Sequence, residues 1–127
     1  MGLAPGDDEP VKSEAIHLSE DAFFLVEFGV VQHVPTYRNF GHWGVTRVPS
    51  SVWIDVLDAI TDLRKKIEKA RGPSDLSFEG MSVVRLMSEF RSNFELTKSG
   101  AVEALRGVSQ VTGGWLDSYD GVFIIGI

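Results

Sequence analysis

The chain has 127 residues, of which 43% are hydrophobic and 24% charged, and its formal net charge is −6 at pH 7. This length fits one domain and is enough to bury a core without metals or disulfides. Cysteine is absent, which excludes disulfides, thiolate catalysis and cysteine zinc sites. The sequence shows no secretory signal pattern and no apolar run near the ~18 residues that span a bilayer, so we expect a soluble cytoplasmic protein without a membrane partner.

The negative charge is concentrated in the first half of the sequence. Residues 1–62 carry ten acids and three bases, whereas residues 63–127 carry eight acids and nine bases. Proteins that bind nucleic acid usually carry a basic surface, so we expect no nucleic-acid partner. The acidity is compatible with a basic protein partner, although solubility alone explains it equally well.

The first 14 residues differ in composition from the rest of the chain. They contain two prolines, two glycines and the acidic run 7–9. Such a composition buries too little apolar surface to offset the entropy of ordering. We therefore predict a flexible arm over residues 1–14 and a single α+β domain over residues 15–127.

Two segments before residue 50 have the pattern of strands. Residues 22–33 are rich in aromatic and β-branched side chains and place apolar residues at every even position from 22 to 30. This predicts a central strand, in which Gly29 marks a bulge. A second strand is predicted over residues 42–48, after a loop over residues 34–41 that contains turn formers.

The clearest helix of the sequence is predicted over Ser50–Arg71. Prolines and glycines bound it, and its charged residues lie opposite one apolar stripe. The stripe consists of Trp53, Val56, Leu57, Ile60, Leu63 and Ile67.

Two further helices are predicted in the second half, together with a strand at the end of the printed sequence. Helical spacing favours residues 82–95 and then a helix that begins at Ser99 and ends at Gly113-Gly114. Gly107 indicates close packing or a shorter helix. Residues 76–79 are predicted to form a short strand or an extended segment before the next helix. The apolar residues 121–127 predict a buried strand.

The fold that these elements indicate is a small α+β domain. An antiparallel or mixed sheet of three to four strands is covered on one face by three helices.

The candidate recognition surface is the segment 34–44, with acids of the 50–71 helix beside it. Tyrosine, tryptophan and arginine contribute much of the binding energy at protein interfaces because they combine large area with few torsions. The competing interpretation is that the aromatic residues fill the core. The predicted partner-binding residues are Tyr37, Arg38, Asn39, Phe40, His42, Trp43, Asp55, Asp58 and Asp62.

Catalysis and metal binding find less support in the sequence. His33 and His42 are the candidate acid and base, but no fixed spacing requires them to meet. The three histidines lack the spacing of a transition-metal site, so no metal is predicted. No phosphate-binding glycine motif is present, and no cofactor is predicted.

Three classes of function therefore remain. The favoured one is a non-catalytic protein-binding module, such as an inhibitor, an immunity-type antidote or an adaptor subunit, that engages a basic protein. The second is a small enzyme or ligand-binding protein with a histidine-containing pocket. The third is a structural subunit of a homo-oligomer, in which strand 121–127 or the N-terminal arm extends a neighbour's sheet.

Overall fold

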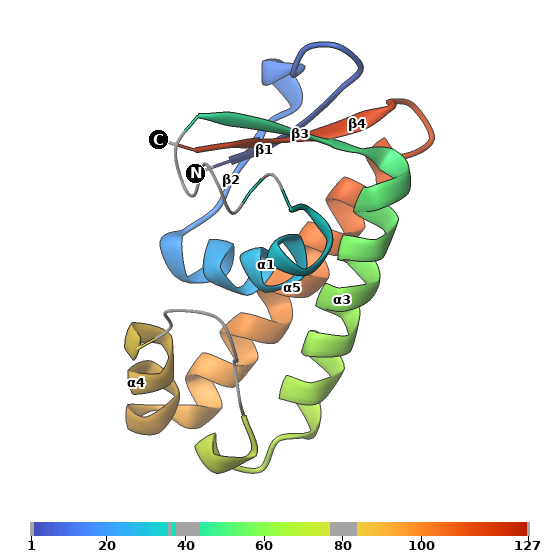
Figure 1. Cartoon of the computed structure of the whole chain (residues 1–127). Helices are drawn as coiled ribbons and strands as arrows, with labels where there is room; N and C mark the ends of the chain where they lie inside the picture. Colours follow the sequence, from blue (N-terminus) through green and yellow to red (C-terminus); the bar gives the residue numbers. More distant parts are fainter. Residues whose placement is uncertain (1, 36, 38–43, 77–83, 127) are drawn as a thin grey trace.

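The computed structural model describes residues 2–35, 37, 44–76 and 84–126, and these residues form an α+β fold (Figure 1). An antiparallel sheet lies over a layer of helices, so the predicted fold class is confirmed. The elements are β1 (Gly2–Gly6), a 3-10 turn η1 (Lys12–Glu14), β2 (Ile16–His17), α1 (Glu20–His33), β3 (Val45–Pro49), α3 (Ser50–Lys69), a 3-10 turn η2 (Pro73–Asp75), α4 (Val84–Ser92), α5 (Phe94–Trp115) and β4 (Gly121–Ile125).

The sheet has the order β2-β1-β4-β3, and each neighbouring pair is antiparallel. β4 lies between β1 and β3, with Ile124 opposite Leu3 and Val122 opposite Val48. These four side chains belong to the hydrophobic core, which lies between the sheet and the helices. The predicted strand 121–127 is confirmed over residues 121–125.

The predicted strand at 42–48 begins, within the described residues, at Val45. It continues to Pro49 as β3. Residues 42 and 43 of that prediction lie outside the described residues.

The N-terminal segment corrects the prediction of a flexible arm over residues 1–14. Gly2–Gly6 form β1, and every residue of this strand is buried. β1 pairs with β4 on one side and with β2 on the other. The prediction failed because it averaged the apolar residues 2–5 with the acidic loop that follows them, although only the loop is exposed.

Residues 22–33 form a helix, so the prediction of a central strand there is wrong. Ser19 caps α1 through its side-chain oxygen, which accepts a hydrogen bond from the Ala22 amide at 3.2 Å. Side chains on several sides of the helix are buried, among them Phe23, Leu25 and Val26. Burial in tertiary structure outweighs the intrinsic β preference of such residues, and a helix that is apolar on all sides lacks a strong amphipathic period.

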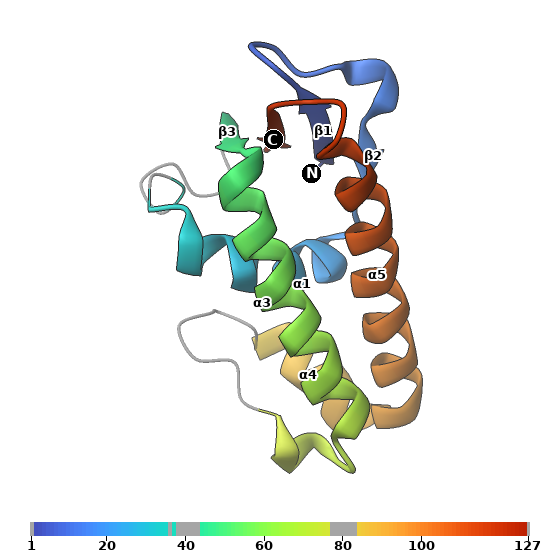
Figure 2. The ribbon, with the colours of Figure 1, turned by 90° about the vertical axis from the view of Figure 1, so that its right-hand side faces the viewer.

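Gly29 marks the point where α1 crosses α3, and not a bulge. A Cβ atom at Gly29 would lie 3.1 Å from the Val56 carbonyl oxygen and 3.4 Å from the Ala59 Cβ. The missing side chain thus lets the two helix backbones approach closely. This contact positions α1 beneath the sheet and against α3, as Figures 1 and 2 show.

The predicted helix over residues 50–71 is confirmed with small changes at its end. α3 spans Ser50–Lys69, and its buried face is the predicted stripe except that Leu57 is only half-buried. Its apolar residues pack against α1 and α5, with which α3 makes its most extensive contacts.

The last two helices have different boundaries from those predicted. α4 ends at Ser92, and α5 begins at Phe94, so Ser99 lies inside a helix and is not its cap. α5 also continues through Gly113-Gly114 to Trp115. Gly107 has open space around its Cβ position within the described chain, and α5 continues past it, so neither close packing inside the chain nor a shorter helix explains it. The short strand predicted at 76–79 falls on residues that, except for Leu76, lie outside the described part.

Substitutions at Gly29 and Gly107 should change stability in opposite directions. We expect Gly29→Val to lower the free energy of unfolding by about 1–3 kcal/mol, because its side chain would press on the α3 backbone. Gly107→Ala should raise it by about 0.5–1 kcal/mol, because alanine restricts the unfolded chain and meets no neighbour. Urea unfolding followed by circular dichroism measures both. A Gly29→Val variant as stable as the wild type would contradict the helix crossing.

Leu3→Ala tests whether the N-terminal strand belongs to the core. Leu3 is 0% exposed, so the truncation should cost about 2–4 kcal/mol of unfolding free energy. Lys12→Ala in the exposed turn η1 is the matched control and should change stability by less than about 0.5 kcal/mol. Thermal and urea unfolding of the three proteins provide the comparison, and a loss below 0.5 kcal/mol for Leu3→Ala would restore the flexible-arm prediction.

Candidate binding surfaces

Three segments that are distant in sequence meet at one end of the molecule. The backbone amide of Asp120 donates to Asp7 Oδ1 at 2.9 Å, and the amide of Ser50 donates to the Asp120 carbonyl at 2.8 Å. Figures 1 and 2 place the loop after β1, the turn before β4 and the start of α3 together beside the sheet. These hydrogen bonds fix the relative positions of the segments.

This meeting point gathers acidic side chains, and we call it the acidic end. All of its carboxylates are on exposed residues. The cations beside these carboxylates are Lys12 of η1 and Arg47 of β3, and Arg47 Nε donates to the Asp7 carbonyl oxygen at 2.7 Å. The acidic end therefore carries a large excess of negative charge. Its members are Asp7, Asp8, Glu9, Glu14, Asp117 and Asp120.

A tyrosine fastens the 3-10 turn η1 to the turn before β4. The Tyr119 hydroxyl donates a hydrogen bond to the Glu14 carboxylate. That hydrogen bond is the main cause of a raised pKa at Tyr119, with contributions from the charges of Glu14 and Asp7. The contact holds the acidic end in one arrangement at neutral pH, where the tyrosine is protonated.

The three predicted acids of α3 extend the negative surface along the helix. Asp55, Asp58 and Asp62 are all exposed and lie on the side of α3 away from its buried stripe. The following turns of the same helix carry Lys65, Lys66 and Lys69, which are also exposed. One helix thus presents an acidic half and a basic half, and the acidic half begins at the acidic end.

Of the residues predicted to form a recognition surface in segment 34–44, Tyr37 is the one that lies within the described part of the chain. Tyr37 is 4% exposed, and its hydroxyl donates to Glu27 Oε2 at 2.7 Å. Burial, followed by this hydrogen bond and the Glu27 charge, raises the pKa of Tyr37 far above its ordinary value. Tyr37 therefore belongs to the core and presents no recognition surface. The other predicted members, Arg38, Asn39, Phe40, His42 and Trp43, lie outside the described residues.

The histidines do not form a site among the described residues. His33 is the last residue of α1 and is exposed, whereas His17 is an exposed residue of β2. His42 lies outside the described residues. Within residues 2–35, 37, 44–76 and 84–126, no group of three potential metal ligands of the His, Cys, Asp or Glu type is brought together.

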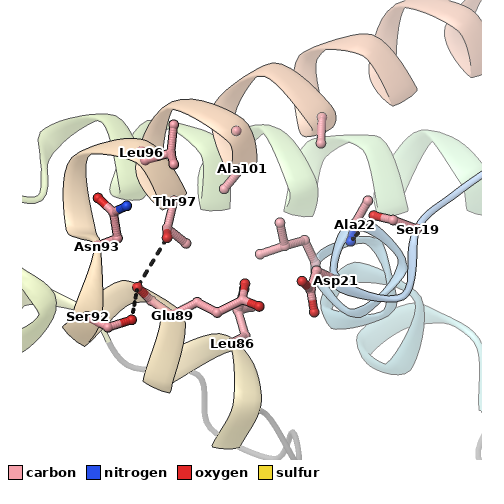
Figure 3. A pocket seen from close by; sticks show the side chains of 13 residues that line it. Ser19, Asp21, Ala22, Leu86, Glu89, Ser92, Asn93, Leu96, Thr97 and Ala101 are labelled. Carbon is pink, nitrogen blue, oxygen red and sulfur yellow. Dashed lines mark hydrogen bonds between the residues drawn. The ribbon is translucent and has the colours of Figure 1, made fainter.

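A groove that sequence reasoning missed lies between the start of α1, α4 and the first half of α5. Its volume is about 460 Å³, and its lining is mainly apolar. Figure 3 shows Asp21 of α1 and Glu89 of α4 facing each other across it, with Ala101 of α5 directed between them. Thr97 Oγ1 donates to the Glu89 carbonyl at 3.1 Å, which ties α4 to α5 beside the groove.

The groove residues gave no signal in the sequence because they come from three helices and are ordinary helix residues. The part of the lining that α5 contributes includes Leu96, Gly100 and Ala104. Correct placement of α1 would have been needed to predict the groove, since α1 forms one of its walls.

Comparison with protein families, with curated protein sequences and with solved structures finds no match to this chain. Among the helices in the part of the chain that the structure describes, none combines the length and the apolarity that a membrane crossing requires. Inferences about function therefore depend on the surfaces described above.

The hydrogen bond between Tyr37 and Glu27 predicts a specific dependence of stability on pH. In the unfolded chain Tyr37 ionises near pH 10, but in the folded chain its raised pKa keeps it protonated. The free energy of unfolding should therefore fall as the pH rises above about 10, by up to about 1.4 kcal/mol per pH unit from this residue. Tyr37→Phe should remove that part of the slope.

Urea unfolding at pH 8 and pH 11 measures the slope in the two proteins. The chain has two tyrosines, so Tyr119→Phe leaves Tyr37 as the single phenol in a spectrophotometric titration. A titration midpoint near pH 10 in folded Tyr119→Phe would contradict the buried hydrogen bond.

Proposed function

We propose that the chain is a non-catalytic protein-binding module, of the inhibitor, antidote or adaptor kind, that engages a basic protein. The acidic end and the acidic half of α3 form its binding surface. The observation that carries the proposal is the assembly of exposed carboxylates from residues 7–14, the turn before β4 and α3. The Asp120 amide bonded to the Asp7 carboxylate and the Ser50 amide bonded to the Asp120 carbonyl hold these segments together.

Electrostatics give such a surface its function. Clustered charges of one sign steer an oppositely charged protein during diffusion and disfavour partners of the same sign. Because hydrogen bonds hold the segments of the acidic end in place, the partner does not have to order them. Binding there would act by steric and electrostatic occlusion of the basic surface of the partner.

The other two classes of function find less support. The apolar groove lies at the opposite end of α1 from His33, and the hollow of about 200 Å³ that Gln32 lines near His33 has no histidine in its lining, so neither supports the histidine-pocket hypothesis. The strand-addition hypothesis needs a free edge, yet β4 is paired on both sides by β1 and β3, and β1 is paired by β2 and β4. The proposal keeps Arg38, Asn39, Phe40, His42 and Trp43 as predicted partner-binding residues.

Neutralising the acidic half of α3 should weaken the partner complex. Three surface charge contacts of about 0.5 kcal/mol each correspond to about a tenfold loss of affinity. The test uses wild type, Asp55→Asn/Asp58→Asn/Asp62→Asn and Asp8→Asn/Glu9→Gln/Asp117→Asn as baits in a source-cell lysate. Mass spectrometry identifies the retained protein, and titration then measures its affinity for each bait.

The same helix supplies a matched control. Lys65→Gln/Lys66→Gln/Lys69→Gln changes the same number of charges on α3 with the opposite sign and should leave the complex intact or strengthen it. Binding should also weaken as salt rises from about 0.05 to 0.3 M, because the Debye length shortens. A retained protein that binds all four folded baits equally would overturn the proposal.

A further inference from the structure

The outer face of α5 exposes aliphatic side chains that no described part of the chain covers. Leu96 is 70% exposed and Val111 is 42% exposed. Both lie on one side of the helix, where residues recur at spacings of three or four and therefore share a face. We call this surface the α5 face, and its members are Leu96, Gly100, Ala104, Gly107, Val111 and Gly114.

Between its two large residues, Leu96 and Val111, the α5 face carries only small side chains. No atom of the described chain, beyond the helix itself, lies within 4 Å of a Cβ atom placed at Gly100, Gly107 or Gly114. Within the chain, Gly29 shows that a glycine allows another helix backbone to approach closely. Leu96, Gly100 and Ala104 also line the groove of about 460 Å³, so the first half of the face has a recess beside it.

We infer that the α5 face docks a second copy of this chain, with the two α5 helices antiparallel. The twofold axis crosses the α5 face at the level of Leu105 along the helix. In this arrangement Leu96 lies opposite Gly114 of the second copy. Val111 lies opposite Gly100 of the second copy, beside the groove. Each large side chain thus meets a glycine, and the twofold axis generates each contact twice.

Charge favours the antiparallel arrangement over a parallel one. Glu103 and Arg106 are exposed and lie together on one side of the α5 face. In the antiparallel pair Glu103 comes opposite Arg106 of the second copy, and the symmetry repeats this contact. In a parallel pair the twofold axis runs along the helices and places Glu103 and Arg106 of the second copy on opposite sides of the contact, so the contact between Glu103 and Arg106 would not form. Arg106 Nη2 also donates to Glu68 at 2.9 Å, but a guanidinium has five donors and can hold both carboxylates.

The size of the face sets the strength of the dimer. Eighteen residues separate Leu96 from Gly114, which is about 27 Å of helix. A single helix pair of this length buries less than the ~1,200 Å² of a stable interface, so the dimer is transient. We expect a dissociation constant on the order of 100 μM.

Sedimentation equilibrium of the full chain between about 0.01 and 1 mM tests the dimer. Wild type should shift from monomer to dimer across this range. Leu96→Glu/Val111→Glu should weaken association at least about tenfold, because the charges would enter an apolar contact. Ile54→Glu is the matched control, since Ile54 is a 49% exposed aliphatic residue on α3 and should leave the association unchanged.

Three results of that experiment would overturn the inference. They are a wild type that stays monomeric at 1 mM, a Leu96→Glu/Val111→Glu variant that dimerises like wild type while folded, and an equal loss of association in Ile54→Glu. Circular dichroism establishes that each variant is folded.

Single cysteines in this cysteine-free chain test the helix orientation. In the antiparallel pair Gly107 lies about 5 Å along the axis from its counterpart, whereas Gly114 lies about 26 Å from its own. Mild oxidation should therefore cross-link Gly107→Cys into a disulfide dimer and leave Gly114→Cys as monomer. Cross-linking of both variants would show a parallel pair, and cross-linking of neither would exclude the contact; each result overturns the inference.

Discussion

The close crossing of α1 and α3 at Gly29 is the contact on which the rest of the structure depends. α1 is apolar on several sides, so it is stable only when other elements surround it. α3 and α5 provide two of these neighbours, and the sheet lies above. Because Gly29 lets α1 approach the backbone of α3, the start of α1 also reaches α4 and α5 and forms one wall of the groove.

The sequence predicted α3 from its periodicity. α3 has one buried and one exposed face over its whole length, and its five buried residues all belong to the predicted stripe. β4 is buried along nearly its whole length and was predicted for a different reason, because it is a short apolar run with turn residues before it.

The two errors in the fold concern segments that are buried on nearly all sides. α1 carries β-branched and aromatic residues, and its nearly uniform apolarity removes the helical period that would have identified it. β1 is short and contains glycine and proline, so local composition resembled a disordered arm. Its burial results from pairing with β4, which is more than 110 residues away in sequence.

The candidate surfaces were predictable where they depended on charge and unpredictable where they depended on packing. The acids of α3 are exposed as predicted, because the amphipathic pattern of a helix shows which of its residues face water. Tyr37 was assigned to a surface on chemical type alone, but a tyrosine whose hydroxyl has a partly buried glutamate as acceptor can be fully buried. The acidic end was not predicted because hydrogen bonds between distant segments assemble it, such as the one from the Asp120 amide to the Asp7 carboxylate.

The two proposed surfaces depend on opposite physical forces, so ionic strength affects them differently. Association of the acidic end with the proposed basic partner would be driven by charge and would weaken as salt rises. Pairing of two α5 faces brings together chains of formal net charge −6, so salt reduces their repulsion while the apolar contact remains. The acidic half of α3 points away from the stripe that packs against α5, so pairing leaves it accessible. A dimer would then present two acidic surfaces, and a partner with two basic sites would bind both with higher avidity than either alone.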